Sequence, residues 1–146
     1  MAERIEFYRS GDDYGELSNF SRHPIELGGH IWPTTEHYFQ AMKFEDAGLR
    51  DRIRAAPGPG DAARMGRRFP GLREDWEEAK EAVMMDALRA KFTQHERLRR
   101  MLLDTGDAEL VEHTRNDFYW ADGGDGTGRN RLGVLLMQLR DELRSP

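Results

Sequence analysis

Residues 34–44 have the pattern of a helix, but with unusual proportions of polar and apolar positions. At about 100° per residue, Glu36, Gln40 and Lys43 fall within about 60° of one another. Aromatic, alanine and methionine side chains occupy most of the remaining circumference. A helix at a protein surface normally has a broad polar face and a narrower apolar one. The reversed proportions predict a mostly buried helix that carries one narrow polar stripe.

The pattern along the rest of the chain predicts short strands and several more helices. Residues 5–8 and 109–114 alternate like strands, and residues 24–32 predict a hairpin with Gly28-Gly29 as its turn. The helix of the polar stripe, capped by Thr34 or Thr35, is expected to run to about residue 47. Further helices are expected over residues 61–67, 73–93, 95–103 and 130–143. Together these elements predict an α+β fold, a single compact helix-dominated domain over residues 1–146.

Composition and charge narrow the class of protein. The chain has no cysteine, which excludes disulfides, thiolate metal sites and a cysteine nucleophile. No apolar run has the length of a signal-peptide core or of a membrane span, so a soluble cytoplasmic protein without a membrane partner is expected. The net charge of −5 argues against broad electrostatic adhesion to nucleic acid. An anionic small molecule or a single modified nucleotide remains compatible with this charge.

Residues 116–133 form a second region of unusual composition, with aspartates, three consecutive aromatic residues and closely spaced glycines ahead of a helix start. Glycines let the backbone approach a ligand, and a helix N-terminus offers N–H groups to an anion, to which Arg129 and Arg131 add charge. The P-loop, the dinucleotide fingerprint and the calcium-loop spacing are all absent. A plain glycine-rich turn is the alternative. The run Phe118-Tyr119-Trp120 argues against it, because adjacent aromatic rings can stack a planar ligand.

No metal site, cofactor site or serine nucleophile is indicated by the motifs. The histidines lack the H-x-x-x-H and H-E-x-x-H spacings, and no G-x-S-x-G segment occurs. The remaining candidates are Glu36, Lys43, Trp76, Asp117 and Trp120. Carboxylates, an amine and indole rings around one pocket would suit cleavage of a bond between a sugar and a planar base. The alternatives are a core position for Trp76 and a surface stripe of charge for Glu36 and Lys43.

Several segments of the chain resemble the YbiA-like, or NADAR, family. The resemblance runs almost end to end and rests on residues 12–20, 32–44, 63–66, Trp76, residues 88–92, 110–114 and 116–133. The sequence is especially similar to the bacterial riboflavin-intermediate N-glycosidases of that family. The resemblance implies the YbiA-like fold and hydrolysis of the N-glycosidic bond of ribosylaminopyrimidine phosphates, with release of ribose 5-phosphate.

Two further functions stay open beside this one. Relatives of the family also remove ADP-ribose from modified guanine in DNA or RNA, with the same residues acting on a larger substrate. The alternative of another class is a binding module that holds ADP-ribose or a related nucleotide without cleaving it. Retention of the matched acids and the lysine disfavours this module, which has no need of them.

The resemblance also implies roles for individual residues. Matched to the motifs of the family, Glu36, Lys43 and Asp117 are expected to be catalytic. Expected substrate-binding residues, some of them placed by the family motifs and Arg129 by its charge, are Asn19, Trp76, Trp120, Asp122 and Arg129. No metal ligand is implied. On this interpretation the polar stripe lines a cleft, while the other faces of its helix pack into the domain.

Overall fold

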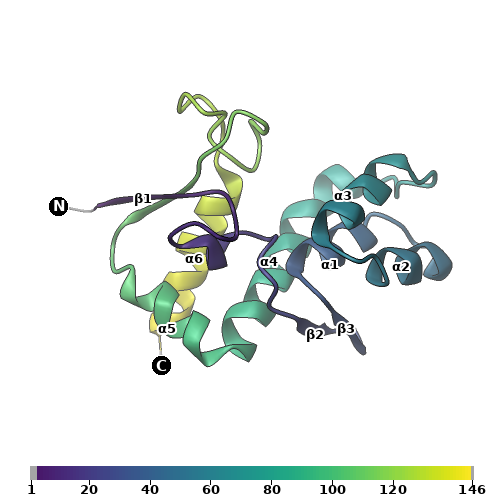
Figure 1. Ribbon diagram of the computed structural model, residues 1–146, viewed down its shortest axis with the longest axis horizontal. Helices are drawn as coiled ribbons and strands as arrows, with labels where there is room; N and C mark the ends of the chain where they lie inside the picture. The colour runs from purple at the N-terminus through teal and green to yellow at the C-terminus, as the bar shows by residue number, and fades with distance from the viewer. Residues whose placement is uncertain (1–2, 146) are drawn as a thin grey trace. The chain divides into compact units, whose positions relative to one another are not determined.

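The computed structural model describes residues 3–145 and has the helix-dominated α+β fold that the sequence predicts (Figure 1). In chain order the elements are β1 (Arg4–Phe7), the 3-10 helix η1 (Gly15–Leu17), β2 (Ile25–Leu27), β3 (His30–Trp32), α1 (Thr35–Ala41), α2 (Ala47–Arg54), α3 (Pro59–Arg68), α4 (Trp76–Gln94), α5 (Glu96–Asp104), β4 (Glu109–Glu112) and α6 (Arg131–Arg144). The described chain divides into two units, residues 22–94 and residues 3–21 together with 95–145. The assignment of residues 1–146 to one domain stays a prediction.

The unit of residues 22–94 opens with the predicted hairpin. Strands β2 and β3 pair antiparallel, with Ile25 opposite Trp32 and Leu27 opposite His30. Gly28 and Gly29 connect them with φ of 66° and 83°. Two consecutive positive φ angles are what a tight two-residue hairpin turn requires, and glycine adopts them without strain. The hairpin is therefore confirmed, and it places Trp32 in the core of this unit.

Helix α1 begins as predicted but ends earlier. Thr34 is its N-cap, with the hydroxyl accepting the backbone N–H of His37 at 3.1 Å. The prediction that the helix runs to about residue 47 is wrong, because the last helical residue is Ala41. Lys43 lies in the turn that follows. Its carbonyl accepts the N–H of Arg73 at 2.8 Å instead of an N–H one turn further along a continuing helix. A separate helix, α2, then begins after Asp46, which caps it.

His37 is a neutral histidine buried inside this unit. Its Nε2 lies 3.0 Å from the carbonyl of Ala56, which can only accept, so Nε2 carries the proton. Nδ1 then accepts from the hydroxyl of Thr34 at 2.8 Å. Burial is the main cause that lowers the pKa of His37. The side chain therefore serves as an uncharged link between the start of α1 and the segment after α2.

Helix α3 starts two positions before the expected aspartate, because Pro59 occupies its first turn, where a missing N–H costs nothing. Helices α3 and α4 both pack against α1. Apolar side chains from the hairpin, from helices α1 to α4 and from the turn after α1 form the core of the unit, including Ile25, Phe44, Ile53, Ala62 and Ala87.

The other unit is built from both ends of the chain. Strand β1 pairs in parallel with β4, which places Ile5 opposite Leu110. Helix α6 packs against β4, and its buried Arg140 donates to the carbonyl of Ala108 and the hydroxyl of Thr105, each at 2.9 Å. The strands themselves are predicted by alternation, whereas their pairing across the whole chain is not. Within residues 3–145, no helix is both long and apolar enough to cross a membrane.

Candidate active site

The polar stripe of α1 contains a buried acid–amide pair. Glu36 and Gln40 are 9% and 6% exposed, and the Gln40 side-chain N–H donates to the carboxylate of Glu36 at 2.7 Å. The two residues stand one turn apart, so the helix itself brings the groups together. A carboxylate removed from water in this way has its charge supported by a specific donor, which is the arrangement expected of an acid–base group.

Lys43 follows α1 and is half-buried. Its ammonium nitrogen lies 6.0 Å from the centroid of the Phe39 ring. Burial is the main cause that lowers the pKa of Lys43, Glu36 opposes this effect, and the positive charges of Arg67 and Lys80 add to it. A lysine with a lowered pKa carries a larger fraction of neutral, nucleophilic amine near neutral pH.

Trp76 is the first residue of α4 and is 6% exposed. Its ring packs against Phe39 with centroids 5.0 Å apart and planes inclined at 60°. Phe39 therefore touches the indole and also lies beneath the ammonium of Lys43. These contacts are those expected if Trp76 is a core residue, which is the alternative to a role in substrate binding. Its role in binding stays a prediction.

In the other unit, Asp117 shapes the turn that presents Trp120. One oxygen of its carboxylate accepts the backbone N–H groups of Tyr119 at 2.8 Å and of Trp120 at 2.7 Å. Trp120 is half-buried, and its ring meets Tyr119 edge-on at a centroid distance of 4.9 Å. An aspartate commonly accepts backbone N–H groups two and three residues later, and these bonds explain the place of Asp117 before Tyr119 and Trp120.

Asp122 has both carboxylate oxygens engaged inside its own unit. One accepts the backbone N–H groups of Thr114 and Gly124, and the other lies 2.7 Å from Nδ1 of His113 and 3.4 Å from Arg4. Burial would raise the pKa of Asp122, but the hydrogen bonds from His113 and Gly124 outweigh it and the pKa is lowered. These contacts favour a role in holding the glycine-rich loop, while substrate binding by Asp122 stays a prediction.

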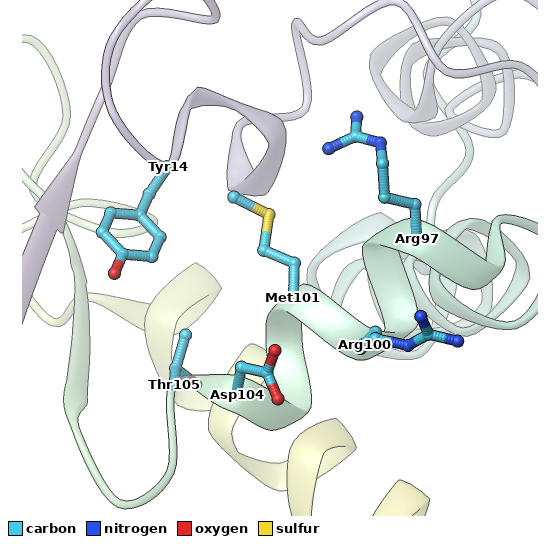
Figure 2. Close-up of a pocket in the computed structure, with 6 residues that line it drawn as sticks. All are labelled: Tyr14, Arg97, Arg100, Met101, Asp104 and Thr105. Carbon is cyan, nitrogen blue, oxygen red and sulfur yellow. The ribbon is translucent and has the colours of Figure 1, made fainter.

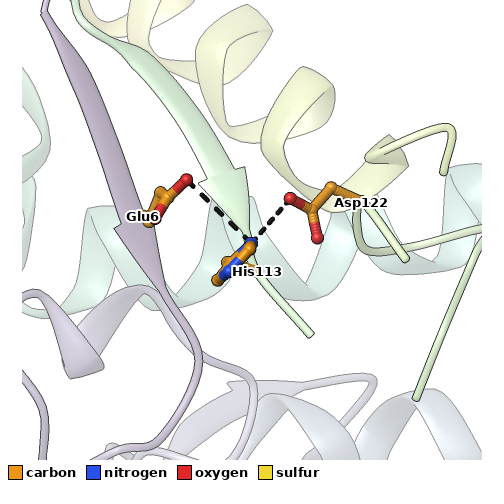
Figure 3. Close-up of side chains that lie close together, drawn as sticks. All are labelled: Glu6, His113 and Asp122. Carbon is orange, nitrogen blue, oxygen red and sulfur yellow. Dashed lines mark hydrogen bonds and ion pairs between the residues drawn. The ribbon is translucent and has the colours of Figure 1, made fainter. Parts of the chain in front are cut away.

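Glu6, His113 and Asp122 bring metal-ligating atoms within 4.8 Å of one another (Figure 3). The guanidinium of Arg4 pairs with Glu6 at 2.9 Å and with Asp122 at 3.4 Å. A fixed positive charge thus already compensates both carboxylates, and the hydrogen bond that His113 donates to Asp122 raises the pKa of His113. The arrangement fits a charge network better than a cation site. Sequence spacing did not reveal it, because Glu6 and Arg4 come from the opposite end of the chain.

The remaining predicted residues have different surroundings. Asn19 is 7% exposed and follows η1, so the structure makes it a buried polar residue. Arg129 is exposed, and its guanidinium lies 5.3 Å from the centroid of the Tyr119 ring. Arg129 can therefore move its charge without losing a buried contact.

A cavity of about 350 Å³ lies between the η1 region and α5 (Figure 2). Its lining includes Tyr14, Arg97, Arg100 and Met101, and none of the residues expected to act in a site. Arg97 pairs with Glu16, and Arg100 pairs with Glu96. The basic segment of α5 thus has local acidic partners, as a solvated helix face does.

The predicted residues therefore fall into two sets. Glu36, Lys43 and Trp76 belong to the unit of residues 22–94, where Gln40 bonds to Glu36 and the ring of Phe39 lies near both Trp76 and Lys43. Asn19, Asp117, Trp120, Asp122 and Arg129 belong to the other unit. Sequence reasoning did not single out Gln40 as a partner of the acid, although its spacing four residues after Glu36 carries that signal.

Known proteins resemble this chain over nearly its whole length. The model of the NADAR domain matches residues 6–144. The N-glycosidase YbiA of Escherichia coli is 59% identical over 140 residues, which cover 95% of this chain and 88% of that protein. The solved NMR structure of the E. coli protein YbiA superposes with a TM-score of 0.91 at 56% identity, covering 99% of this chain and 87% of that one. The riboflavin biosynthesis protein VVA0006 of Vibrio vulnificus is 42% identical over 145 residues, 99% of this chain and 40% of that protein.

The fold and these relatives define an enzyme that hydrolyses N-glycosyl bonds. The chain belongs to the NADAR family.

Proposed function

We propose that this enzyme hydrolyses the N-glycosidic bond of ribosylaminopyrimidine phosphates, intermediates of riboflavin biosynthesis, and releases ribose 5-phosphate. The observation that carries the proposal is the buried Glu36–Gln40 pair near a lysine of lowered pKa. Support for the substrate class comes from the relative named a riboflavin biosynthesis protein, of which this chain spans less than half the length.

The proposed chemistry divides between proton transfer and stabilisation of positive charge. Glu36 moves protons to and from the substrate, and Asp117 stabilises cationic character at the anomeric carbon as the bond to the base breaks. Trp76 and Trp120 stack against the base or its sugar, and Arg129 contacts the phosphate. These assignments follow from the residue types and from the family motifs that they match.

A second candidate is removal of ADP-ribose from ADP-ribosylated guanine in DNA or RNA. It uses the same residues, and the half-buried Trp120 of the glycine-rich loop suits a guanine ring as well as a pyrimidine. A module that binds ADP-ribose without cleaving it is disfavoured, because such a module gains nothing from a buried carboxylate or from an amine of lowered pKa.

We place the enzyme in the cytoplasm.

One incubation separates the three functions. The protein is mixed with a ribosylaminopyrimidine phosphate and, in parallel, with an oligonucleotide that carries ADP-ribosylated guanine, and the products are identified by mass spectrometry. We expect ribose 5-phosphate and free aminopyrimidine from the first substrate. Release of ADP-ribose alone would favour the second candidate. Binding of ADP-ribose with neither substrate cleaved would contradict hydrolysis.

Exhaustive chelation is expected to leave the activity intact, because carboxylates and an amine supply the proposed chemistry. The measurement is the initial rate before and after dialysis against EDTA. The cluster of Glu6, His113 and Asp122 makes the test informative, since it offers the closest approach to a ligand set among the described residues. Loss of activity that zinc or magnesium restores would contradict this prediction.

Trp120→Ala is expected to lower kcat/KM about 5- to 150-fold, because base–aromatic stacking contributes ~1–3 kcal/mol per ring. Phenylalanine at the same position should restore part of the loss. The matched test at Trp76 uses Trp76→Phe as well as Trp76→Ala, since loss of the buried packing against Phe39 also lowers the midpoint of thermal unfolding. A folded Trp120→Ala protein with full activity would assign Trp120 to structure alone.

A further inference from the structure

Glu36 takes part in a contact between α1 and α3, and the charged group that faces it most directly is the ammonium of Lys43, beside which Arg67 and Lys80 also lie. On one side, the Gln40 amide donates to its carboxylate at 2.7 Å in a buried position. On the other side, the carbonyl oxygen of the same amide faces Gly66 of α3. A Cβ built on Gly66 would lie 1.9 Å from that oxygen and 2.8 Å from the amide carbon. The space for the Gln40 amide therefore exists only because residue 66 lacks a side chain.

Among the described residues, the Gln40 amide makes no second hydrogen bond. Its buried carbonyl oxygen has no hydrogen-bond partner among residues 3–145. Buried polar atoms are nearly always paired, so an unpaired one calls for a reason. Here the amide is placed by its bond to Glu36 and by the space that the missing side chain of Gly66 leaves for it. A side chain at residue 66 would therefore displace the amide that donates to the carboxylate.

The orientation of the amide also has a chemical consequence. An N–H that donates to a carboxylate favours the ionised form of the acid. Turning the amide over would place its carbonyl oxygen against the carboxylate oxygen, and two acceptors repel each other unless the acid is protonated. The Gln40 amide thus favours an ionised Glu36 that is ready to accept a proton.

We propose that Gln40 and Gly66 are positioning residues for the Glu36 carboxylate, with Gly66 setting the place of the amide and the amide setting the place and ionisation of the acid. The catalytic consequence rests on the proposed function, in which Glu36 transfers protons. The contact itself is testable without any substrate.

The experiment follows the Glu36 carboxyl by NMR in the full-length protein labelled with ¹³C at the side-chain carboxyl of glutamate, with Glu36→Gln to assign its signal. Gln40→Met removes the donor at similar volume, and Gly66→Ala displaces the amide while Gln40 stays in place. Gly60→Ala is the matched control, because Gly60 lies on the same helix and a Cβ there meets no atom within 4 Å. Gln40→Asn, which retains an amide but is one methylene shorter, keeps the test valid if Gly66→Ala does not fold.

We expect Gln40→Met and Gly66→Ala each to raise the titration midpoint of Glu36 by about one pH unit, as loss of one hydrogen bond to a charged group implies. Gly60→Ala should leave the midpoint unchanged. The acidic limb of the pH–rate profile should move in the same direction as the NMR midpoint, which a purely structural role of Gln40 would not cause.

Three outcomes are decisive. An unchanged midpoint in folded Gly66→Ala and Gln40→Met proteins would overturn the positioning proposal. A shift shared by Gly60→Ala would also overturn it, because the effect would then come from α3 as a whole. A midpoint that moves only in the two test variants, with turnover unchanged, would support the positioning of the carboxylate and contradict the role of Glu36 in the proposed function.

Discussion

Glu36→Gln is expected to lower turnover at least ~100-fold while leaving the fold intact, because a general acid–base group typically contributes 10²–10⁴ to the rate. The amide oxygen of the new glutamine can still accept the N–H of Gln40, so the buried hydrogen bond survives and only ionisation is lost. The measurements are kcat for base release and the circular dichroism spectrum. A near-normal rate in the folded variant would return Glu36 to a structural role.

Asp117→Asn is the parallel test in the other unit, with the same expected loss. Asparagine retains the oxygen that accepts the N–H groups of Tyr119 and Trp120, so the turn keeps its shape. Asp117→Ala provides the contrast, because it removes the turn contacts together with the charge. If Asp117→Asn were fully active while Asp117→Ala was not, the aspartate would serve the turn rather than the chemistry.

Borohydride added during turnover is expected to fix a sugar adduct on Lys43. A ribosylamine opens at its anomeric carbon to an imine, and the neutral amine of Lys43 attacks that carbon. The base leaves as the free amine, and a lysine imine to the sugar takes its place. Water then hydrolyses this imine, which releases the sugar aldehyde and regenerates the lysine. Hydride reduces the imine to a stable amine that mass spectrometry locates.

Lys43→Arg should abolish the adduct and most of the turnover, since a guanidinium does not form the imine. Lys80→Arg is the matched control, because Lys80 is a lysine near Lys43 whose ammonium pairs with Glu77 one turn away on α4. Substrate consumption without an adduct, together with an active Lys43→Arg protein, would exclude the covalent route and leave direct attack by water.

The pH dependence of this step follows from the lowered pKa of Lys43. Only the neutral amine attacks, so the rate of adduct formation should rise with pH and level off once the lysine is deprotonated. Because burial lowers that pKa from its ordinary value of 10.5, the plateau should begin below the pH at which a solvent-exposed lysine would reach it. A plateau at the ordinary value would contradict desolvation of the amine.

The local elements were predictable where local chemistry decides them. The Gly28-Gly29 turn and the Thr34 cap are set by residues adjacent in sequence, and both occur as predicted. The end of α1 was not predictable from periodicity, because Phe44 continues the apolar pattern although it pairs with Leu72 outside the helix. That pairing depends on a contact with a distant residue, which spacing along the chain does not encode.

The candidate site divides in the same way. Glu36 and Gln40 share a stripe because α1 carries both, and Lys43 lies in the turn just after the end of this helix, so their proximity is a local property. The surroundings of Asp122 are different, since Arg4 and His113 reach it through the pairing of β1 with β4. The sequence predicts a substrate-binding role for Asp122, whereas in the structure both of its carboxylate oxygens bond to residues of its own unit.

The pairing of β1 with β4 has a consequence for synthesis on the ribosome. Arg4 and its partner Glu109 are 105 residues apart, so β1 emerges long before the strand that completes it. At roughly 5–20 residues per second, the delay is about 5 to 20 s. Residues 22–94 form a unit of contiguous sequence and can fold during this interval. Strand β1 meanwhile keeps an unpaired edge, which exposes this part of the nascent chain to chaperones and to wrong pairing until β4 is made.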